Sequence, residues 1–154
     1  MPTPRSTASD GAAGAMTGSE ARGAFAAARV ARLATVGEDG RPHLVPIVFA
    51  VDGERVYHAV DHKPKRTTAL RRLDNIAAQP HVALLADEYD DDDWTRLWWV
   101  RADGAARLLE PGGGEARAAV DLLAARYAQY RAVTPSGTVV AVDVERWTGW
   151  RAAT

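Results

Sequence analysis

One short stretch of the sequence gathers side chains that could bind an anion. Residues 57–72 read YHAVDHKPKRTTALRR, although the whole chain carries a formal net charge of -1. The cations in this stretch are Lys63, Lys65, Arg66, Arg71 and Arg72. The stretch joins a strand-like run to a helix-like run, and the free N–H groups at a helix start attract negative charge. Pro64 stiffens the segment, and the hydroxyls of Thr67 and Thr68 add donors. These features predict a phosphate cradle; the alternative is a group of solvated surface cations.

The elements before the basic stretch are predicted to be strands. Asp39-Gly40 and Asp52-Gly53 each separate two runs rich in strand-forming residues, which predicts hairpins and a three-stranded antiparallel meander over residues 30–60. Pro42 and Pro46 lack N–H donors, so the middle strand is expected to be interrupted, bulged or at an edge of the sheet.

The elements after the basic stretch alternate between helices and strands. We expect a helix over residues 67–80, capped by Thr67 or Thr68, and a buried strand over residues 81–86. A long strand over residues 94–109, bent or bulged at Gly104, precedes a helix over residues 112–130 and a last strand over residues 138–150. About six mostly antiparallel strands with two connecting helices indicate a small β-barrel.

The first 23 residues differ in composition from the rest of the chain. They are rich in Ala, Gly, Ser, Thr and Pro, and we expect a disordered tail over residues 1–23 and one domain over residues 24–154. Met16 is a second candidate start. The tail lacks the apolar core of a secretory signal, from which we expect a cytoplasmic protein. There is no cysteine, which excludes disulfides and thiolate catalysis, and no apolar run of about 20 residues, the length of a membrane span.

Three other groups of residues could carry chemistry. Residues 87–93 hold six carboxylates, but their spacing lacks the features of an EF-hand, so a solvated loop is favoured over a Ca²⁺ or Mg²⁺ site. The histidines are scattered, and no metal site is expected. His58 could bond a ligand or donate a proton, or be satisfied within its strand. The tryptophans are assigned mainly to core and dimer packing. Nucleic-acid binding is disfavoured by the near-neutral charge.

The order of these motifs resembles a known superfamily. Residues 32–67, RLATVGEDGRPHLVPIVFAVDGERVYHAVDHKPKRT, are similar to the pyridoxamine 5'-phosphate oxidase-like, flavin-binding split-barrel proteins. Within that superfamily, GRPHLVPI, KPKRTTALRRL, the acidic loop and WTRLWWVRADGAA resemble the actinobacterial class that uses the deazaflavin coenzyme F420. The resemblance extends from Phe25 to about Trp150.

The resemblance implies a mostly β fold: a six-stranded antiparallel split barrel that forms a homodimer, with the cofactor in a groove between the two chains. The residues it assigns to the cofactor ring are Val45, Pro46, Ile47, Tyr57, His58, Ala59 and Val60. Those it assigns to the phosphate are Lys63, Lys65, Arg66, Thr67 and Arg72. The second chain would contribute Trp94 and Thr95. Relatives often carry an Arg where this chain has Pro64, and Lys63 or Lys65 would then have to replace it.

The implied function is an oxidoreductase that uses reduced coenzyme F420 to transfer a hydride to a small unsaturated or conjugated substrate. Because the cofactor performs hydride transfer, no set of catalytic side chains is expected. F420 carries a phosphate and a poly-glutamate tail, both anionic, whereas FMN ends at its phosphate. A basic groove therefore suits F420 better than FMN. An FMN-dependent oxidase or reductase of the same fold is the first alternative. The second is a protein that stores, carries or senses the cofactor without turnover.

Overall fold

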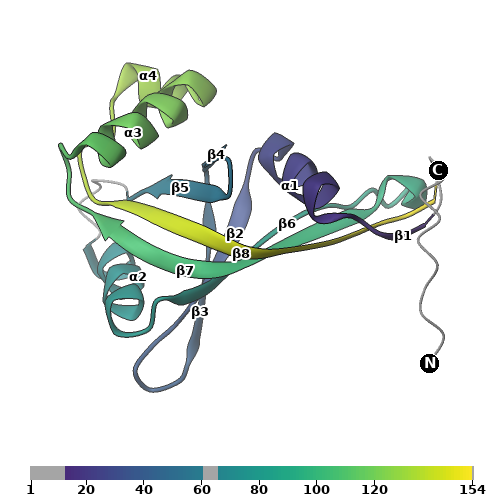
Figure 1. The fold of residues 1–154 in the computed structure, drawn as a ribbon, viewed down its shortest axis with the longest axis horizontal. Helices are drawn as coiled ribbons and strands as arrows, with labels where there is room; N and C mark the ends of the chain where they lie inside the picture. Colours follow the sequence, from purple (N-terminus) through teal and green to yellow (C-terminus); the bar gives the residue numbers. More distant parts are fainter. Residues whose placement is uncertain (1–12, 61–65, 154) are drawn as a thin grey trace.

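The described part of the chain forms one curled antiparallel sheet with helices packed against it (Figure 1). The computed structural model describes residues 13–60 and 66–153, with side chains over 13–60 and 71–153. The strands are β1 (Gly14–Ala15), β2 (Ala31–Val36), β3 (Pro42–Ile47), β4 (Ala50–Asp52), β5 (Arg55–Ala59), β6 (His81–Glu88), β7 (Trp98–Leu109) and β8 (Val139–Arg151). The helices are α1 (Gly18–Ala27), α2 (Arg66–Ala78), the 3-10 turn η1 (Trp94–Arg96), α3 (Gly114–Arg126) and α4 (Ala128–Ala132).

The strand order explains why the sheet curls. It runs β3-β2-β6-β7-β8-β5-β4, with the short β1 paired to β8. The two edge strands, β3 and β4, are separated along the chain only by Val48 and Phe49. Such a short connection requires the two edges to approach each other, so the sheet bends round into an open barrel.

This order corrects the predicted meander. The β2–β3 and β4–β5 hairpins are confirmed, with Gly40 at φ 76° and Gly53 at φ 59° in their turns. However, the predicted middle strand is interrupted at Val48 and Phe49, and its first part, β3, does not pair with β4 or β5. Strand β5 pairs with β4 on one side and with β8 on the other. This interruption and the short β1 bring the number of strands in the described part of the chain to eight rather than six. The expectation of an interrupted edge strand at Pro42 and Pro46 is confirmed by β3.

The predicted disordered tail is wrong from Gly14 onward. Thr17 caps α1 through a capping box with Glu20, and Ala21 and Phe25 on the inner face of the helix are fully buried. The Phe25 ring packs 4.7 Å from Phe49 and 5.5 Å from Trp147, measured between ring centroids. The prediction missed this helix because its residues are mostly Ala, Gly and Ser, and these small residues allow close packing. The rest of the predicted tail, residues 1–12, lies outside the described residues.

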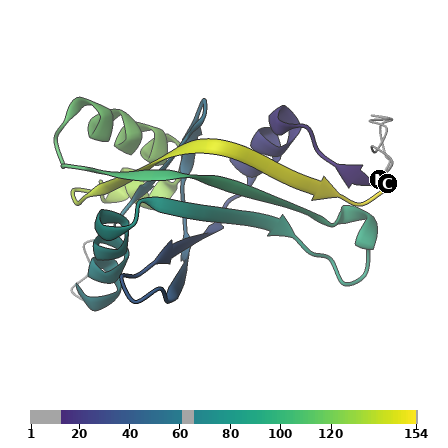
Figure 2. The ribbon, with the colours of Figure 1, turned by 60° about the horizontal axis from the view of Figure 1, so that its bottom comes forward.

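Strands β6, β7 and β8 extend beyond the curled part of the sheet as a long arm, and α1 packs against it (Figure 2). The turn η1 connects β6 to β7 at the end of this arm. The predicted long strand therefore starts at Trp98 rather than Trp94. The physical reason is local: the Asp93 carboxylate accepts a hydrogen bond from the Thr95 N–H at 3.1 Å, which closes a turn. The bulge at Gly104 is confirmed by a register shift against β8.

Strand β5 is covered on both faces. Val56 and Val60 belong to the main core inside the curled sheet, together with Val45 and Ile47 of β3. On the opposite face, Tyr57 packs with residues of α3 and β8. This double burial matters for the site, because alternate residues of β5 lie in different environments.

Candidate functional site

A polar cluster lies where α2 packs against the sheet. We call it the imidazole–arginine cluster; its members are His43 of β3, His58 of β5, and Arg71 and Arg72 of α2. The Arg72 Nη1 lies in hydrogen-bond contact with the His58 Nε2. Burial lowers the pKa of His43, and the charges of Arg71 and Arg72 lower it further. The cluster therefore combines two cations with two imidazoles.

Arg72 is the most unusual member of this cluster. Its side chain is half-buried, and burial lowers its pKa from the ordinary value. The Nε atom is buried without a hydrogen-bond partner. Over the described residues, the structure gives neither Arg71 nor Arg72 an ion pair with a carboxylate. A cation with an unpaired donor and no carboxylate partner among the described residues is in the state expected of an anion-binding arginine.

His58 is neutral at physiological pH. Its residue surface is 6% exposed, and its pKa is lowered to about 3, first by burial and then by the charge of Arg72. An arginine can only donate, so the His58 Nε2 must be the accepting, unprotonated nitrogen. The proton of the neutral ring therefore resides on Nδ1.

A second polar contact anchors α2 one turn further on. The Asn75 Nδ2 donates to the Thr35 Oγ1 of β2 at 3.0 Å, and the two residues are 8% and 1% exposed. Ile76 beside it enters the main core. Because α2 is attached to both β2 and β5, the backbone that carries Arg72 is held in place on the sheet.

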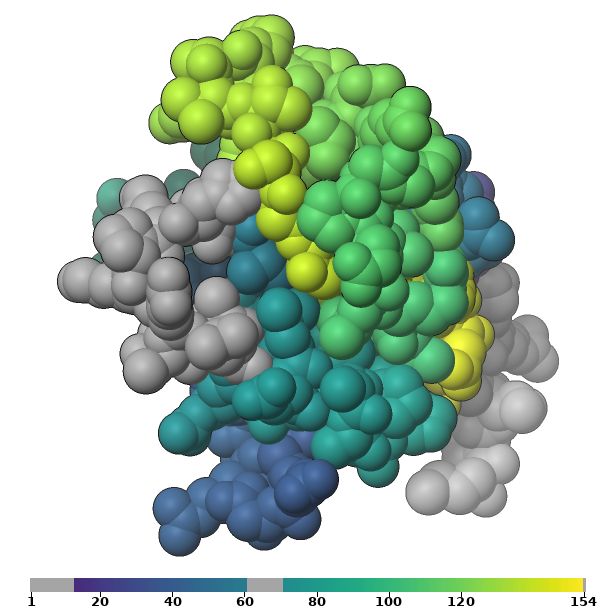
Figure 3. Space-filling view, turned by 90° about the vertical axis from the view of Figure 1, so that its left-hand side faces the viewer, coloured from purple at the N-terminus to yellow at the C-terminus, as the bar shows by residue number. Residues whose placement is uncertain are grey.

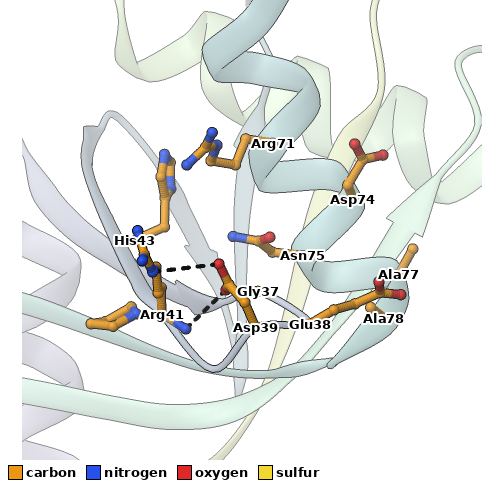
Figure 4. Close-up of a pocket in the computed structure, with 11 residues that line it drawn as sticks. Gly37, Glu38, Asp39, Arg41, His43, Arg71, Asp74, Asn75, Ala77 and Ala78 are labelled. Carbon is orange, nitrogen blue, oxygen red and sulfur yellow. Dashed lines mark hydrogen bonds and ion pairs between the residues drawn. The ribbon is translucent and has the colours of Figure 1, made fainter.

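An open pocket adjoins the cluster (Figure 4). The β2–β3 hairpin forms one wall with residues 37–43, and α2 forms the other between Arg71 and Ala78. Arg71 and His43 point toward each other across it, and the His43 Nδ1 is buried without a partner. On the molecular surface, α2 lies between the blue hairpin and the green helix α3 (Figure 3). The pocket thus opens to solvent at His43 and Arg71, whereas Arg72 and His58 are not among its lining residues.

The structure separates the residues predicted to contact the ring into different environments. Val45 and Ile47 of β3 point into the main core, whereas Pro46 between them is exposed on the outer face of the sheet. Val60, directly after β5, joins the main core, and His58 of β5 contacts Arg72. Tyr57 and Ala59 lie on the other face, and the Tyr57 hydroxyl donates to Glu115 of α3 at 3.3 Å. The described residues bring His58, but not Tyr57 or Ala59, to the cluster.

The predicted phosphate residues are placed only in part. Lys63 and Lys65 lie outside the described residues. Arg66 and Thr67 lie in the first turn of α2, where only the backbone is described, so Thr67 follows the helix start instead of capping it. Arg72 is the predicted phosphate residue whose side chain the structure describes, and it lies in the cluster.

Trp94 and Thr95 lie in η1, away from α2 along the arm. Strand β6, of eight residues, separates the end of α2 from the acidic loop and spans about 25 Å. Trp94 is 65% exposed. One chain therefore does not bring these residues to the cluster. The acidic loop bonds locally: Glu88 pairs with Arg96 at 2.9 Å, and the Asp90 carboxylate accepts from the Asp92 N–H at 2.9 Å.

Sequence reasoning missed His43 and Asn75, for which no local pattern exists. It also did not show that Arg71 and Arg72 lie on different faces of α2. The helical period could have done so, since Arg72 is four residues before the buried Ile76 and shares its face. No group of metal-ligating side chains occurs over the described residues. Among the helices described, none is long and apolar enough to span a membrane.

Comparison with known proteins gives relatives of two kinds. A curated relative, the 5a,11a-dehydrotetracycline/5a,11a-dehydrooxytetracycline reductase of Streptomyces rimosus, is 35% identical over 86 residues. The match spans 56% of this chain and 59% of that protein, which is less than two thirds of its length.

Two solved structures share the fold at low identity. A FAD-binding protein from Mesorhizobium loti superposes with a TM-score of 0.72 at 21% identity, over 92% of this chain and 98% of that one. The heme storage protein HutZ from Vibrio cholerae superposes with a TM-score of 0.66 at 17% identity, over 85% and 92%. Residues 18–151 match the family model described as pyridoxamine 5'-phosphate oxidase. The predicted family is therefore confirmed: this chain belongs to the pyridoxamine 5'-phosphate oxidase family and has its split-barrel fold.

Proposed function

We propose that this protein is an oxidoreductase that uses reduced coenzyme F420 to transfer a hydride to a small unsaturated or conjugated substrate. The observation that carries the proposal is Arg72, a half-buried cation with an unpaired Nε–H and, over the described residues, no carboxylate partner. Leaving a buried charge unpaired is unfavourable. A phosphate of the bound cofactor would supply the missing counter-charge.

The residues around Arg72 suit a phosphate-bearing cofactor. The N-terminus of α2 begins at Arg66, six residues before Arg72, and its first-turn N–H groups have no partners within the helix. Lys63 and Lys65 precede that turn in the sequence. The cofactor, when bound, supplies the hydride chemistry. The chain's own residues then have to hold its anionic part, keep its reactive ring in place and exclude water.

The substrate class is supported by the Streptomyces rimosus relative. That protein is named as a reductase of dehydrotetracyclines, which are conjugated ring systems. Since the match covers 59% of its length, a shared reaction type is a better-founded proposal than a shared substrate.

A second copy of the chain is part of the proposal, because one chain leaves Trp94 and Thr95 away from α2. The outer face of the sheet offers a surface for such contact. Leu44 is 66% exposed on β3 and Leu85 is 40% exposed on β6. Trp99 and Trp150 are register partners on the arm. We propose a homodimer in which the arm of one chain reaches the cofactor groove of the other.

Two alternatives are supported by specific observations. FMN also ends in a phosphate, so the same Arg72 would serve an FMN-dependent oxidase or reductase. A carrier or storage protein without turnover is the other alternative, because the similar structures include a FAD-binding protein and a heme storage protein.

The test is a parallel titration of the protein with F420 and FMN, followed by tryptophan fluorescence. Arg72→Ala should weaken binding of the preferred cofactor by about 10- to 100-fold, the effect of one charge-assisted hydrogen bond. The control is Arg117→Ala, since Arg117 is exposed and donates to the Gly112 carbonyl at 2.7 Å at the start of α3.

Each outcome of the titration discriminates between the proposals. Preference for F420 with turnover of a conjugated acceptor supports the proposed function, whereas binding without turnover supports a carrier. Preference for FMN selects the first alternative. If neither cofactor binds more tightly than about 100 μM, roughly -5.5 kcal/mol, the proposed function is wrong. Lys65→Ala and Arg66→Ala extend the test to two predicted phosphate residues whose side chains the structure does not describe.

A further inference from the structure

His58 occupies a position that does not suit a residue acting directly on a substrate. It lies on the inner face of β5 between Val56 and Val60, both of which belong to the main core. Its imidazole is neutral at pH 7, so it has no imidazolium proton to donate to a substrate. The partner it contacts is the Arg72 guanidinium. Its chemical role therefore has to be understood through Arg72.

The Arg72 side chain has few other restraints. Over the described residues no carboxylate orients it, and the other influence on its charge is the nearby Tyr130. A long arginine side chain loses considerable rotamer freedom when a ligand immobilises it. An acceptor inside the protein that already holds one nitrogen of the guanidinium reduces this loss. The buried, neutral Nε2 of His58 is such an acceptor.

We infer that His58 is a positioning residue: its imidazole accepts from the Arg72 Nη1 and fixes the orientation in which the guanidinium presents its positive charge to the anionic group of a ligand. The identity of that ligand rests on the proposed function, whereas the arrangement is a property of this chain. A carboxylate in place of His58 would also hold the guanidinium, but it would neutralise the charge needed for the anion. A neutral acceptor orients the cation and preserves its charge.

Two matched substitutions separate positioning from packing. His58→Gln places an amide acceptor near the position of Nε2, and His58→Asn places it near Nδ1, where it does not reach Arg72. Both are polar and uncharged. The first readout is the Arg72 Nε–H signal in a ¹⁵N NMR spectrum, assigned by its loss in Arg72→Lys. We expect a distinct, slowly exchanging signal in the wild type and in His58→Gln, and an averaged signal in His58→Asn. An unchanged Arg72 signal in His58→Asn would overturn the inference.

The second readout is cofactor affinity in a double-mutant cycle. His58→Asn should weaken binding by about 5- to 20-fold and His58→Gln by less than about 2-fold, because only the first removes the acceptor. In an Arg72→Ala background, His58→Asn should have no further effect. Additive losses would show that His58 acts independently of Arg72 and would overturn the inference. The exposed His81, changed to Asn, is the control and should leave affinity unchanged.

The two readouts keep the inference distinct from the proposed function. If the wild type binds neither F420 nor FMN, the proposed function fails, and the Arg72 NMR signal then decides the inference alone. His58→Asn need not be fully stable for this comparison, because His58→Leu can replace it as a variant without an acceptor. If neither variant folds, retention of the Arg72 signal in His58→Gln is the supporting result, and its loss there overturns the inference.

Discussion

The Arg107 guanidinium on β7 bridges two carboxylates from different elements. It donates to both oxygens of Glu115 on α3, at 2.9 and 2.8 Å, and to both oxygens of Asp143 on β8, at 2.7 and 3.0 Å. These bonds attach α3 to the sheet directly above Tyr57. They therefore help to determine which face of β5 is covered by the helix.

Arg107→Gln should destabilise the protein by about 1–2 kcal/mol, since the bonds are charge-assisted but partly exposed to solvent. Arg107 lowers the pKa of both Glu115 and Asp143. A lowered folded-state pKa gives stability that is present above the unfolded value, about 4, and is lost as pH falls through the folded value. Below about pH 5, the free energy of unfolding measured with urea should therefore depend less steeply on pH in Arg107→Gln than in the wild type.

The matched control is Arg101→Gln, which breaks the exposed pair with Asp103 at 3.0 Å. Its effect should stay within about 0.5 kcal/mol. Equal losses in the two variants would contradict a special role for Arg107.

Gly104 allows a close approach between β7 and β8. A Cβ atom at this position would lie 2.3 Å from the Asp143 carbonyl oxygen, which belongs to the backbone and has little room to move. Gly104→Ala should therefore cost about 2 kcal/mol or more, through displacement of the strands at the bulge. Thermal unfolding monitored by circular dichroism measures this effect.

Gly23→Ala is a sensitive control for that experiment. Gly23 lies in α1, and a Cβ atom there meets nothing within 4 Å. Alanine should increase stability by about 0.5–1 kcal/mol through its higher helix propensity. A neutral Gly104→Ala variant would mean that the strands separate more easily at the bulge than the structure indicates.

The fold was predictable wherever local chemistry determines it. The Asp-Gly turns, the bulge at Gly104 and helix α2 follow from short patterns, and the structure confirms them. The pairing of β5 with β8 joins residues 80 or more positions apart in sequence, and no local pattern encodes it. Helix α1 was missed because its Ala, Gly and Ser residues resemble a disordered tail. Only the positions of Thr17 and Glu20 indicate a helix start.

The site shows the same division. The charge and the helix start predicted a phosphate cradle in the basic stretch, and the family resemblance assigned Arg72 to it; that assignment stays a prediction that the titration tests. The contact between Arg72 and His58 depends on the position of α2 against the sheet. The Asn75–Thr35 hydrogen bond and the burial of Ile76 determine that position. Such contacts between elements distant in sequence require the tertiary structure.

Tyr127 holds the connection between the two edge strands. Its buried hydroxyl accepts from the Phe49 N–H at 3.2 Å and lies 3.0 Å from the Phe49 carbonyl and 3.1 Å from the Arg29 carbonyl, to which it can donate. Tyr127→Phe should cost about 1–3 kcal/mol, because it leaves the Phe49 N–H buried and unpaired. Chemical unfolding checks the value. Tyr89→Phe, at a 61% exposed position, should change stability by less than about 0.5 kcal/mol, and a similarly small loss at Tyr127 would refute the argument.

His58 makes the protein sensitive to mild acid. Its folded-state pKa is about 3, lowered from 6.5 by burial and by Arg72. Between these values the unfolded chain binds a proton that the folded chain excludes, so stability falls as pH drops below about 6.5. The largest slope from one such group is about 1.4 kcal/mol per pH unit. Urea unfolding from pH 7 to pH 5 should show this slope in the wild type.

His58→Gln should reduce that slope, because glutamine does not titrate. The lowered pKa of His43 leaves a smaller slope of the same sign in the variant. Confining the measurement to pH 5–7 avoids the carboxylate effects expected for Arg107. His81→Gln, at an exposed position, should retain the wild-type slope. If His58→Gln and the wild type lose stability equally between pH 7 and pH 5, His58 is not a buried neutral imidazole, and its assigned contact with Arg72 is wrong.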